Sequence, residues 1–251
     1  MRITGIIPSR YASQRLPGKP LAMIKGTTMI QRVFEQVLKC SELDELVVAT
    51  DNEKIFSHVL DFGGKAIMTS QNHYSGTDRC YEAACKLNIQ DNDQVIVNIQ
   101  GDEPFINPQQ ITDLIGCFKS DEVQIATLVK KITHNEDVFN VSKPKVVVNN
   151  KNQAMYFSRS PVPYMRNVEP QMWFENHSFL KHIGLYGYRF GALKKIASLP
   201  ASPLERAESL EQLRWLENGF IIQTELTQYE SVSIDTIEDL ENINKESDDF
   251  S

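Results

Sequence analysis

The sequence predicts an α/β fold with a mainly parallel central sheet, on three observations. Short apolar runs alternate with helical patterns from the start of the chain to about residue 130, which is typical of a parallel sheet covered by helices. The stretch at about 140–188 instead shows hairpin and proline signals, which predict an antiparallel insertion. With 251 residues, of which 41% are hydrophobic, the chain can bury a large core. We therefore expect a single domain over 1–251, with its core at 1–139 and 189–245.

Each element follows from a local pattern. Continuous apolar runs between turn signals predict strands, whereas apolar side chains recurring every three or four residues predict helices. The first half has strands at 3–8, 46–50, 65–68 and 94–100, separated by helices at 28–39, about 55–62 and about 77–87. The second half has a strand at 123–130, a hairpin of strands 145–149 and 154–157, an extended stretch at 158–166, strands at 181–189 and 220–226, and helices at 202–218 and about 237–244. Asp51, directly after a strand, is a candidate helix N-cap.

The composition excludes several classes of function. The chain carries 26 Lys and Arg against 33 Asp and Glu, a net charge of −7. Nucleic acid and anionic membranes are therefore not expected as main partners, because both need a broad basic surface. No apolar run reaches transmembrane length, and the first ten residues lack the apolar stretch of a signal peptide. The 4 cysteines match no zinc spacing, so we expect reduced thiols in a cytoplasmic protein.

The loop after the first strand is the leading candidate for a binding site. It carries three fixed cations, Arg10, Arg15 and Lys19, and two prolines that stiffen it. A cationic loop at the carboxyl end of a first strand suits a polyphosphate. Neither the P-loop motif nor the usual dinucleotide fingerprint is present. The alternative is a basic surface loop with exposed arginines.

Two later stretches also follow strands. Ser75 and Thr77 belong to a polar loop that leads into a helix with Arg79 near its start, and such a loop can hold a base or a ribose. Asp102 follows the strand at 94–100, at a turn of glycine and proline. A carboxylate at a strand end, facing a cationic loop, favours Mg²⁺ with a nucleotide. A solvated Arg79 and a turn-forming Asp102 are the alternatives.

The last third holds further candidates with competing interpretations. Asp235 begins a D-x-x-E pattern before the final helix, so an ordinary helix cap competes with a role as a ligand. Glu211 and Gln212 belong to the polar set of the helix at 202–218, for which a solvated face is the alternative.

Eight stretches together resemble one family over about residues 1–242. They are IIPSRYASQRLPGKPL, VVATDN, FGGKAIMTS, HYSGTDR, NIQGDEPFI, YFSRSPVPY, KHIGLYGYR and ESLEQLRWLENG. The first of these, with SGTDR and QGDEP, is specific to the 3-deoxy-manno-octulosonate (Kdo) cytidylyltransferases, or CMP-Kdo synthetases. The resemblance implies a Rossmann-like nucleotidyltransferase fold and the synthesis of CMP-Kdo and pyrophosphate from CTP and Kdo, for bacterial lipopolysaccharide. It also implies Mg²⁺ as cofactor and a homodimer formed through the middle region, which would carry sugar binding too.

The resemblance assigns roles residue by residue. Arg10, Arg15 and Lys19 would hold the CTP phosphates, while Ser75, Thr77, Arg79 and Gln100 would contact the rest of the nucleotide. Asp102 and Asp235 would be the Mg²⁺ ligands and, with Arg10 and Lys19, the catalytic residues. Gln100, Arg159, His182, Tyr186, Glu211 and Gln212 would line the sugar-acid pocket. Ile237 departs from the family pattern, since proline commonly opens the last helix, and this bears on the orientation of Asp235.

The implied mechanism is in-line attack of the C2 hydroxyl of the sugar on the α-phosphorus of CTP. Positioning and charge stabilisation suffice for it, without a side-chain nucleophile. Alternatives are CMP transfer to another acid sugar, such as 8-amino-Kdo or a sialic acid, and a nucleotide sensor without catalysis. The sensor would lack the two carboxylates that this sequence carries.

Overall fold

The structure is a computed structural model that describes residues 1–12, 16–230 and 232–245, in two compact units. Unit one comprises the described residues of Met1–Thr112, Tyr188–Ala197 and those from Glu230 onward, and unit two comprises Asp113–Gly187 and Ser198–Tyr229. The expected insertion at about 140–188 falls almost entirely within unit two. The single-domain arrangement stays a prediction.

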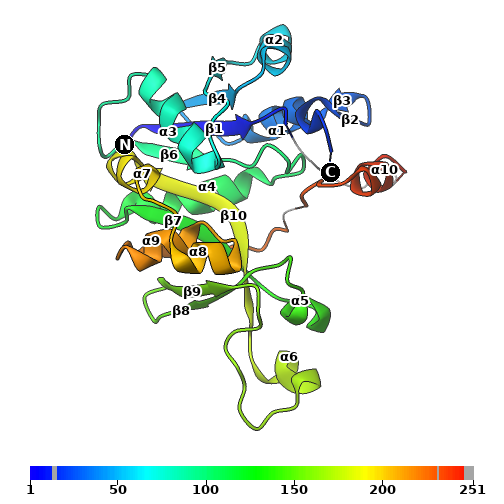
Figure 1. Cartoon of the computed structure of the whole chain (residues 1–251), viewed down its shortest axis with the longest axis vertical. Helices are drawn as coiled ribbons and strands as arrows, with labels where there is room; N and C mark the ends of the chain where they lie inside the picture. Colours follow the sequence, from blue (N-terminus) through cyan, green and yellow to red (C-terminus); the bar gives the residue numbers. More distant parts are fainter. Residues whose placement is uncertain (13–15, 231, 246–251) are drawn as a thin grey trace. The chain divides into compact units, whose positions relative to one another are not determined.

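Unit one is built on parallel strands in the order β6-β1-β4-β5 (Figure 1). They are β1 (Ile3–Ser9), β4 (Glu45–Thr50), β5 (Ala66–Met68) and β6 (Val95–Asn98). Ile6 and Ile7 at the centre of β1 are fully buried, and all of β6 is buried. Because a parallel sheet is covered on both faces, its strands are continuous apolar runs, which is the signal that predicted them.

The helices of unit one are α1 (Met29–Val37), α2 (Glu53–Asp61), α3 (Gly76–Lys86), α7 (Phe190–Ala197) and α10 (Ile237–Lys245), while α4 (Pro108–Gly116) begins in this unit and ends in unit two. Four of them, namely α1, α2, α3 and α10, lie where helices are predicted, whereas α7 was not predicted. The N-cap of α2 is Asn52, whose side chain accepts a hydrogen bond from the backbone N–H of Lys54, so the interpretation of Asp51 as that cap is wrong. Asp51 is thereby available for a tertiary contact.

A small core fixes the chain around the cationic loop. The 3-10 helix η1 (Lys19–Leu21) is followed by the hairpin of β2 (Met23–Ile24) and β3 (Thr27–Thr28). Leu16, Ile24 and Met29 pack with Ile234 and Ile243 from the other end of the chain. This cluster brings the start of α10 to the loop that holds Lys19.

Unit two combines parallel and antiparallel strands. Strands β7 (Ile125–Lys131) and β11 (Ile222–Leu226) are parallel neighbours in the order β11-β7-β10, where β10 spans Leu180–Arg189. Strand β8 (Lys145–Val148) pairs antiparallel with β10 and with β9 (Ala154–Ser158). The predicted α/β class, with a mainly parallel sheet and antiparallel strands in the middle of the chain, is therefore confirmed.

The short helices of unit two include one departure from prediction. They are η2 (Cys117–Lys119), α5 (Asn135–Phe139), η3 (Pro170–Met172), α6 (Trp173–Asn176), α8 (Pro203–Glu208) and α9 (Gln212–Glu217). The single helix expected at 202–218 breaks at Ser209, whose φ of 52° is left-handed. Arg159 donates hydrogen bonds to the carbonyls of Glu208 and Ser209, at 2.7 and 3.1 Å. These tertiary hydrogen bonds satisfy the backbone carbonyls at the end of α8, where the helix breaks.

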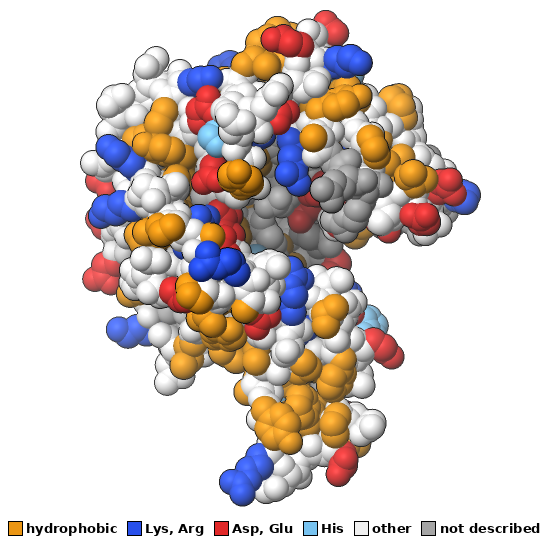
Figure 2. Space-filling view, in the orientation of Figure 1, with side chains coloured by type: hydrophobic (Ala, Val, Ile, Leu, Met, Phe, Trp, Pro, Cys, Tyr) orange, Lys and Arg blue, Asp and Glu red, His pale blue; other side chains and the backbone are white. Residues whose placement is uncertain are grey.

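An aromatic cluster forms in unit two around α6. Trp173 and Phe179 are buried and stacked, at 6.4 Å between ring centroids. Tyr164 contacts Trp173 edge-on and is 77% exposed. Figure 2 shows hydrophobic side chains gathered at the lower end of the view, over the region of α6. Within the described residues, the helices are too short or too polar to cross a membrane.

Candidate nucleotide site

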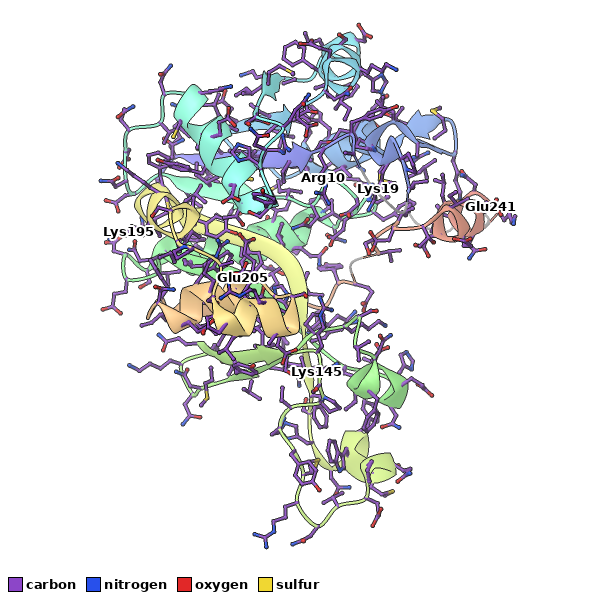
Figure 3. All side chains as sticks on the ribbon, in the orientation of Figure 1. Arg10, Lys19, Lys145, Lys195, Glu205 and Glu241 are labelled. Carbon is purple, nitrogen blue, oxygen red and sulfur yellow. The ribbon has the colours of Figure 1, made fainter. Side chains whose placement is uncertain are left out.

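A pocket of about 800 Å³ lies in unit one, where β1 and β6 end and α3 begins. Predicted site residues that line it are Arg10, Lys19, Ser75, Arg79, Gln100, Asp102 and Asp235. Figure 3 shows Arg10 and Lys19 together just beyond β1. The carboxyl ends of parallel strands are where open α/β sheets bind ligands. The pocket therefore unites residues that are spread over most of the sequence.

Lys19 is the central cation of this pocket. Its Nζ donates to Asp102 Oδ2 at 2.6 Å and to Asp235 Oδ1 at 2.9 Å, and the residue is only 9% exposed. The loop before it is closed by backbone hydrogen bonds, from Gly18 N to the carbonyl of Tyr11 and from Lys19 N to that of Leu16. Gly18 has a φ of 68°, a conformation that glycine adopts without strain. The turn thus directs Lys19 at both carboxylates.

The orientation of Asp235 follows from the start of α10. Thr236 Oγ1 accepts from the backbone N–H of Asp239 at 3.1 Å, and Asp239 Oδ2 accepts from the N–H groups of Thr236 and Asp235 at 2.9 and 3.0 Å. This reciprocal arrangement caps the helix. Ile234 N also donates to the carbonyl of Asp102 at 3.0 Å, which holds the two acidic residues side by side. Capping therefore falls to Thr236 and Asp239, and the carboxylate of Asp235 meets Lys19.

The two carboxylates suit an oxygen-seeking divalent cation such as Mg²⁺. They already hold one cation between them, and Mg²⁺ prefers a site of one or two carboxylates completed by waters and phosphates. The described residues contain no group of three or more His, Cys, Asp or Glu side chains that would form a closed metal site. Asp102 and Asp235 are therefore candidate ligands that need oxygens from a substrate.

The end of β6 and the start of α3 form the opposite side of the pocket. A side chain at Gly101 would place its Cβ 3.0 Å from the carbonyl oxygen of Pro8, so glycine permits the close approach of two strand ends. Ser75 caps α3 by accepting from Asp78 N at 3.1 Å, and Thr77 is buried in the first turn of the helix. The N-terminus of this helix faces the pocket, where its dipole favours an anion. Ser9 also lines the pocket, and its buried Oγ has no hydrogen-bond partner within the described residues.

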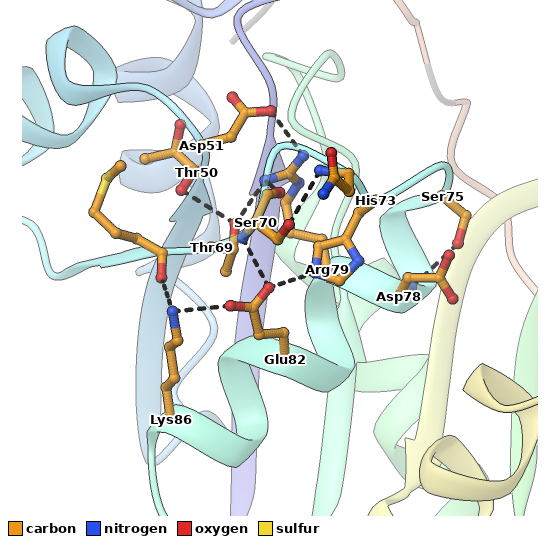
Figure 4. Close-up of polar contacts among 12 residues, drawn as sticks. Thr50, Asp51, Thr69, Ser70, His73, Ser75, Asp78, Arg79, Glu82 and Lys86 are labelled. Atoms are coloured by element: carbon orange, nitrogen blue, oxygen red, sulfur yellow. Dashed lines mark hydrogen bonds and ion pairs between the residues drawn. The ribbon is translucent and has the colours of Figure 1, made fainter.

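Arg79, which lines the pocket, forms a largely buried ion pair with Asp51 (Figure 4). Arg79 Nη2 lies 2.9 Å from Asp51 Oδ2, and Nη1 donates to Thr69 Oγ1 at 2.6 Å and to the carbonyl of Ser70 at 3.3 Å. Asp51 Oδ1 accepts from the backbone N–H of Tyr11, in the cationic loop, at 3.3 Å. The pair thus connects α3 to three segments that we call the rim of the pocket: the cationic loop, the residue after β4, and the loop at Thr69 and Ser70. Sequence reasoning missed this role of Asp51. The available signal was its place directly after β4, because the carboxyl ends of parallel strands are where ligand sites form.

Glu82 anchors the remaining loop of the rim. It accepts from Ser70 N at 2.8 Å, pairs with Lys86 at 2.8 Å and contacts His73 Nε2, and His73 lines the pocket. Burial raises the pKa of Glu82, but the hydrogen bonds from Lys86, Ser70 and His73 outweigh it and lower the pKa to about 2. The carboxylate is therefore charged at neutral pH and holds the loop that leads to Ser75.

The predicted sugar-binding residues other than Gln100 lie in unit two. Arg159 donates to three carbonyls, those of Val141, Glu208 and Ser209, and so supports the bend between α8 and α9. His182 Nε2 lies 3.0 Å from Thr127 Oγ1. That hydroxyl lies 2.8 Å from the carbonyl of Leu185, to which it donates, so Nε2 carries the proton given to Thr127.

His182, Tyr186 and α9 form one aromatic chain. Desolvation lowers the pKa of His182 to about 3, so its imidazole is neutral at pH 7. The ring centroid of Tyr186 lies 5.2 Å from that of His182 and 5.0 Å from that of Trp215 on α9. Glu211 pairs with Arg214 at 2.5 Å, and Gln212 is 4% exposed. Arg15 lies outside the described residues.

These features define a class. A parallel sheet with a cationic loop after its first strand and a carboxylate pair facing that loop has the arrangement of a nucleotidyltransferase.

Comparisons with known proteins narrow the class. A family model described as cytidylyltransferase matches residues 4–244. The chain is 55% identical over 245 residues to a 3-deoxy-manno-octulosonate cytidylyltransferase of Parabacteroides distasonis, and 54% identical over 243 residues to one of Bacteroides thetaiotaomicron, with 96% of each chain covered in both cases. A solved CMP:2-keto-3-deoxy-manno-octonic acid synthetase complexed with CTP is 42% identical, with a TM-score of 0.89 over 97% of both chains. The chain belongs to the 3-deoxy-manno-octulosonate cytidylyltransferases, a family of enzymes, as its sequence motifs predicted.

Proposed function

We propose that the protein activates Kdo with CTP, giving CMP-Kdo and pyrophosphate for bacterial lipopolysaccharide synthesis. The observation that carries this proposal is the pocket of unit one, in which Lys19 faces Asp102 and Asp235 at the ends of parallel strands. The CTP complex of a relative that is 42% identical, and the names of the relatives that are 54% and 55% identical, support the choice of nucleotide and sugar.

The cations of the pocket bind the triphosphate in this proposal. Arg10 is exposed within the pocket, and Lys19 points into it from the same loop. The N-terminus of α3 adds the partial positive charge of its dipole. Ser75, Thr77, Arg79 and Gln100 are proposed to contact or orient the rest of the nucleotide. For Arg79 we propose an indirect contribution, because its guanidinium is already held by Asp51, Thr69 and Ser70.

The two carboxylates hold Mg²⁺ in this proposal. When bound, the ion would neutralise charge on the α-phosphate and lower the pKa of the attacking hydroxyl. Asp102 and Asp235 fix its position, since the backbone bond from Ile234 to Asp102 keeps them adjacent. Arg10 and Lys19 stabilise the negative charge that develops on the departing pyrophosphate. The C2 hydroxyl of the sugar releases its proton to solvent, and its oxygen forms a bond to the α-phosphorus while the bond from that phosphorus to the bridging β-phosphate oxygen breaks.

We propose that residues of unit two bind the acid sugar. A neutral His182 and the buried amide of Gln212, whose Nε2 has no hydrogen-bond partner within the described residues, can bond sugar hydroxyl groups. Tyr186 offers an aromatic face beside His182. Glu211 is paired with Arg214, and Arg159 with backbone carbonyls, so we propose that these two shape the pocket around the sugar.

A homodimer through the middle region is the proposed assembly. Phe139, Tyr164 and Met172 expose 40%, 77% and 43% of their surfaces beside the buried Trp173. Exposed apolar patches of this kind are typical of protein interfaces. Light scattering after size-exclusion chromatography measures the mass directly, and Tyr164→Glu should convert the dimer to a monomer of 28.6 kDa. A wild-type monomer would contradict the proposal.

Pyrophosphate release is the test of the reaction. The purified protein is assayed with CTP, ATP, GTP or UTP, each with and without Kdo, in the presence of Mg²⁺. We expect release with CTP and Kdo together, and far less with any other pair. Preferred use of 8-amino-Kdo or a sialic acid would establish the alternative acceptor. Release that does not depend on any sugar would overturn the proposal.

A further inference from the structure

Lys19 occupies the position between two carboxylates that the proposed metal would need. Its Nζ lies 2.6 Å from Asp102 Oδ2 and 2.9 Å from Asp235 Oδ1. Its side chain is 11% exposed and each carboxylate is 33% exposed, so the three groups form a partly buried cluster. One ammonium neutralises only half of the charge of two carboxylates. A divalent cation would match the pair in charge more closely than the ammonium does.

The ammonium and a divalent cation exclude one another at this place. Mg²⁺ binds oxygens at about 2.1 Å, and its carboxylate ligands would be the same two side chains that Lys19 contacts. A divalent ion inserted between them would lie within a few ångströms of Nζ, where two positive charges repel strongly. Metal binding therefore requires the ammonium to leave.

The structure allows Lys19 to move while both carboxylates stay. The backbones of Asp102 and Asp235 are held by the bond from Ile234 N to the Asp102 carbonyl and by the cap at Thr236 and Asp239. The backbone of Lys19 is likewise held, in η1 between Gly18 and Pro20. Lysine, in contrast, carries its charge on a flexible four-carbon stem. Nζ can thus swing within a pocket whose other lining residues include Arg10 and the start of α3.

We propose that Lys19 is a resident counter-ion that exchanges with the divalent cation. It holds the carboxylate pair and keeps a free metal ion out, and it transfers to the nucleotide phosphates when metal and nucleotide enter together. This inference rests on the metal site proposed above. Because binding free energies are reciprocal, metal and nucleotide then each strengthen the binding of the other. A nucleotide-free enzyme would bind the metal weakly, and the ion would be recruited with its substrate.

Binding of Mn²⁺ to the nucleotide-free protein tests the exchange. Mn²⁺ is a paramagnetic ion whose free concentration is measured by electron paramagnetic resonance. Titrations at pH 8 compare the wild type with Lys19→Met and Lys19→Gln, which lack the charge, and with Lys19→Arg, which keeps it. Lys65→Met, which removes an exposed lysine of the same unit, controls for net charge. Circular dichroism and thermal unfolding identify which neutral variants are folded at the titration temperature.

The expected result is that a neutral variant binds Mn²⁺ at least about 10-fold more tightly than the wild type, which is about 1.4 kcal/mol. Lys19→Arg and Lys65→Met should remain within about 2-fold of the wild type, a difference of about 0.4 kcal/mol. Adding Asp102→Asn to Lys19→Met should abolish the gain.

Two results would overturn the inference, and they are distinguishable. If the neutral variants bind no more tightly than the wild type while Asp102→Asn weakens binding, Lys19 does not compete, and the metal site stands. If the double variant Lys19→Met with Asp102→Asn binds as tightly as Lys19→Met, the ion lies elsewhere and the proposed metal site fails as well.

Discussion

Replacing Asp51 by Asn should both destabilise the protein and weaken its use of CTP. Asp51 holds Arg79, whose side chain is only 4% exposed, and the backbone N–H of Tyr11 in the cationic loop. Asn keeps the shape of the side chain but removes its charge. The Arg79 guanidinium would then be left with Thr69 Oγ1, the carbonyl of Ser70 and a neutral amide. Its positive charge would remain buried without a carboxylate.

The magnitude follows from the burial of this pair. A hydrogen bond to a charged group contributes about 1.5–3 kcal/mol, and removing one partner of a buried pair costs about 3–5 kcal/mol. Because Asn still accepts one hydrogen bond, we expect a loss of about 2–3 kcal/mol in the free energy of unfolding. The rim loops would also lose their common anchor, so KM for CTP should rise more than kcat falls.

Urea unfolding and steady-state kinetics measure the two effects. Glu45→Gln is the matched control, because Glu45 lies on β4, the strand that ends just before Asp51, but pairs with the exposed Arg2 and Lys65. Pairs of that kind contribute about 0–1 kcal/mol, so the control should stay close to wild type in both assays. An Asp51→Asn variant with the stability and the KM of the control would show that the ion pair does not organise the rim.

Three further predictions concern the same unit. Asp102→Asn and Asp235→Asn should each stay folded and lose nearly all turnover. Asp235 is not needed as a helix cap, because Thr236 caps α10. Normal activity of Asp235→Asn with unchanged Mg²⁺ dependence would contradict the two-carboxylate site. Glu82 has a pKa lowered to about 2, below its usual value of 4.5, so its stabilising effect is present above about pH 4.5 and is lost as the pH falls toward 2. Glu82→Gln should therefore flatten the acid side of the profile of unfolding free energy against pH, and an unchanged acid slope would count against this assignment. Ser9→Ala removes a buried hydroxyl that has no hydrogen-bond partner within the described residues, so urea unfolding should show an equal or greater free energy of unfolding. A decrease of more than about 1 kcal/mol would show that the hydroxyl makes a hydrogen bond in the protein.

The sequence by itself determined the class of fold, the family and the loop that carries the cations. These depend on local information. Apolar runs such as β6 are buried on both faces of a parallel sheet and are visible as runs, and α1 shows its buried face as a repeat of apolar residues. The capping box that opens α8, in which Ser202 and Glu205 bond to one another's backbone, is likewise a pattern of four consecutive residues.

Only the tertiary structure decided which side chains meet. Lys19 pairs with Asp102 and Asp235, which are 83 and 216 positions away, and no local pattern indicates that contact. At the break at Ser209 the backbone carbonyl contacts Arg159, which lies 50 positions earlier in the chain, so helical propensity over 202–218 could not reveal it. Asp51 looked like a helix cap because its neighbours favour one, yet the fold places Arg79 beside it. Local preferences are set by neighbouring residues, whereas the partners of a charged side chain are set by the order of strands in the sheet, which places distant loops at one edge.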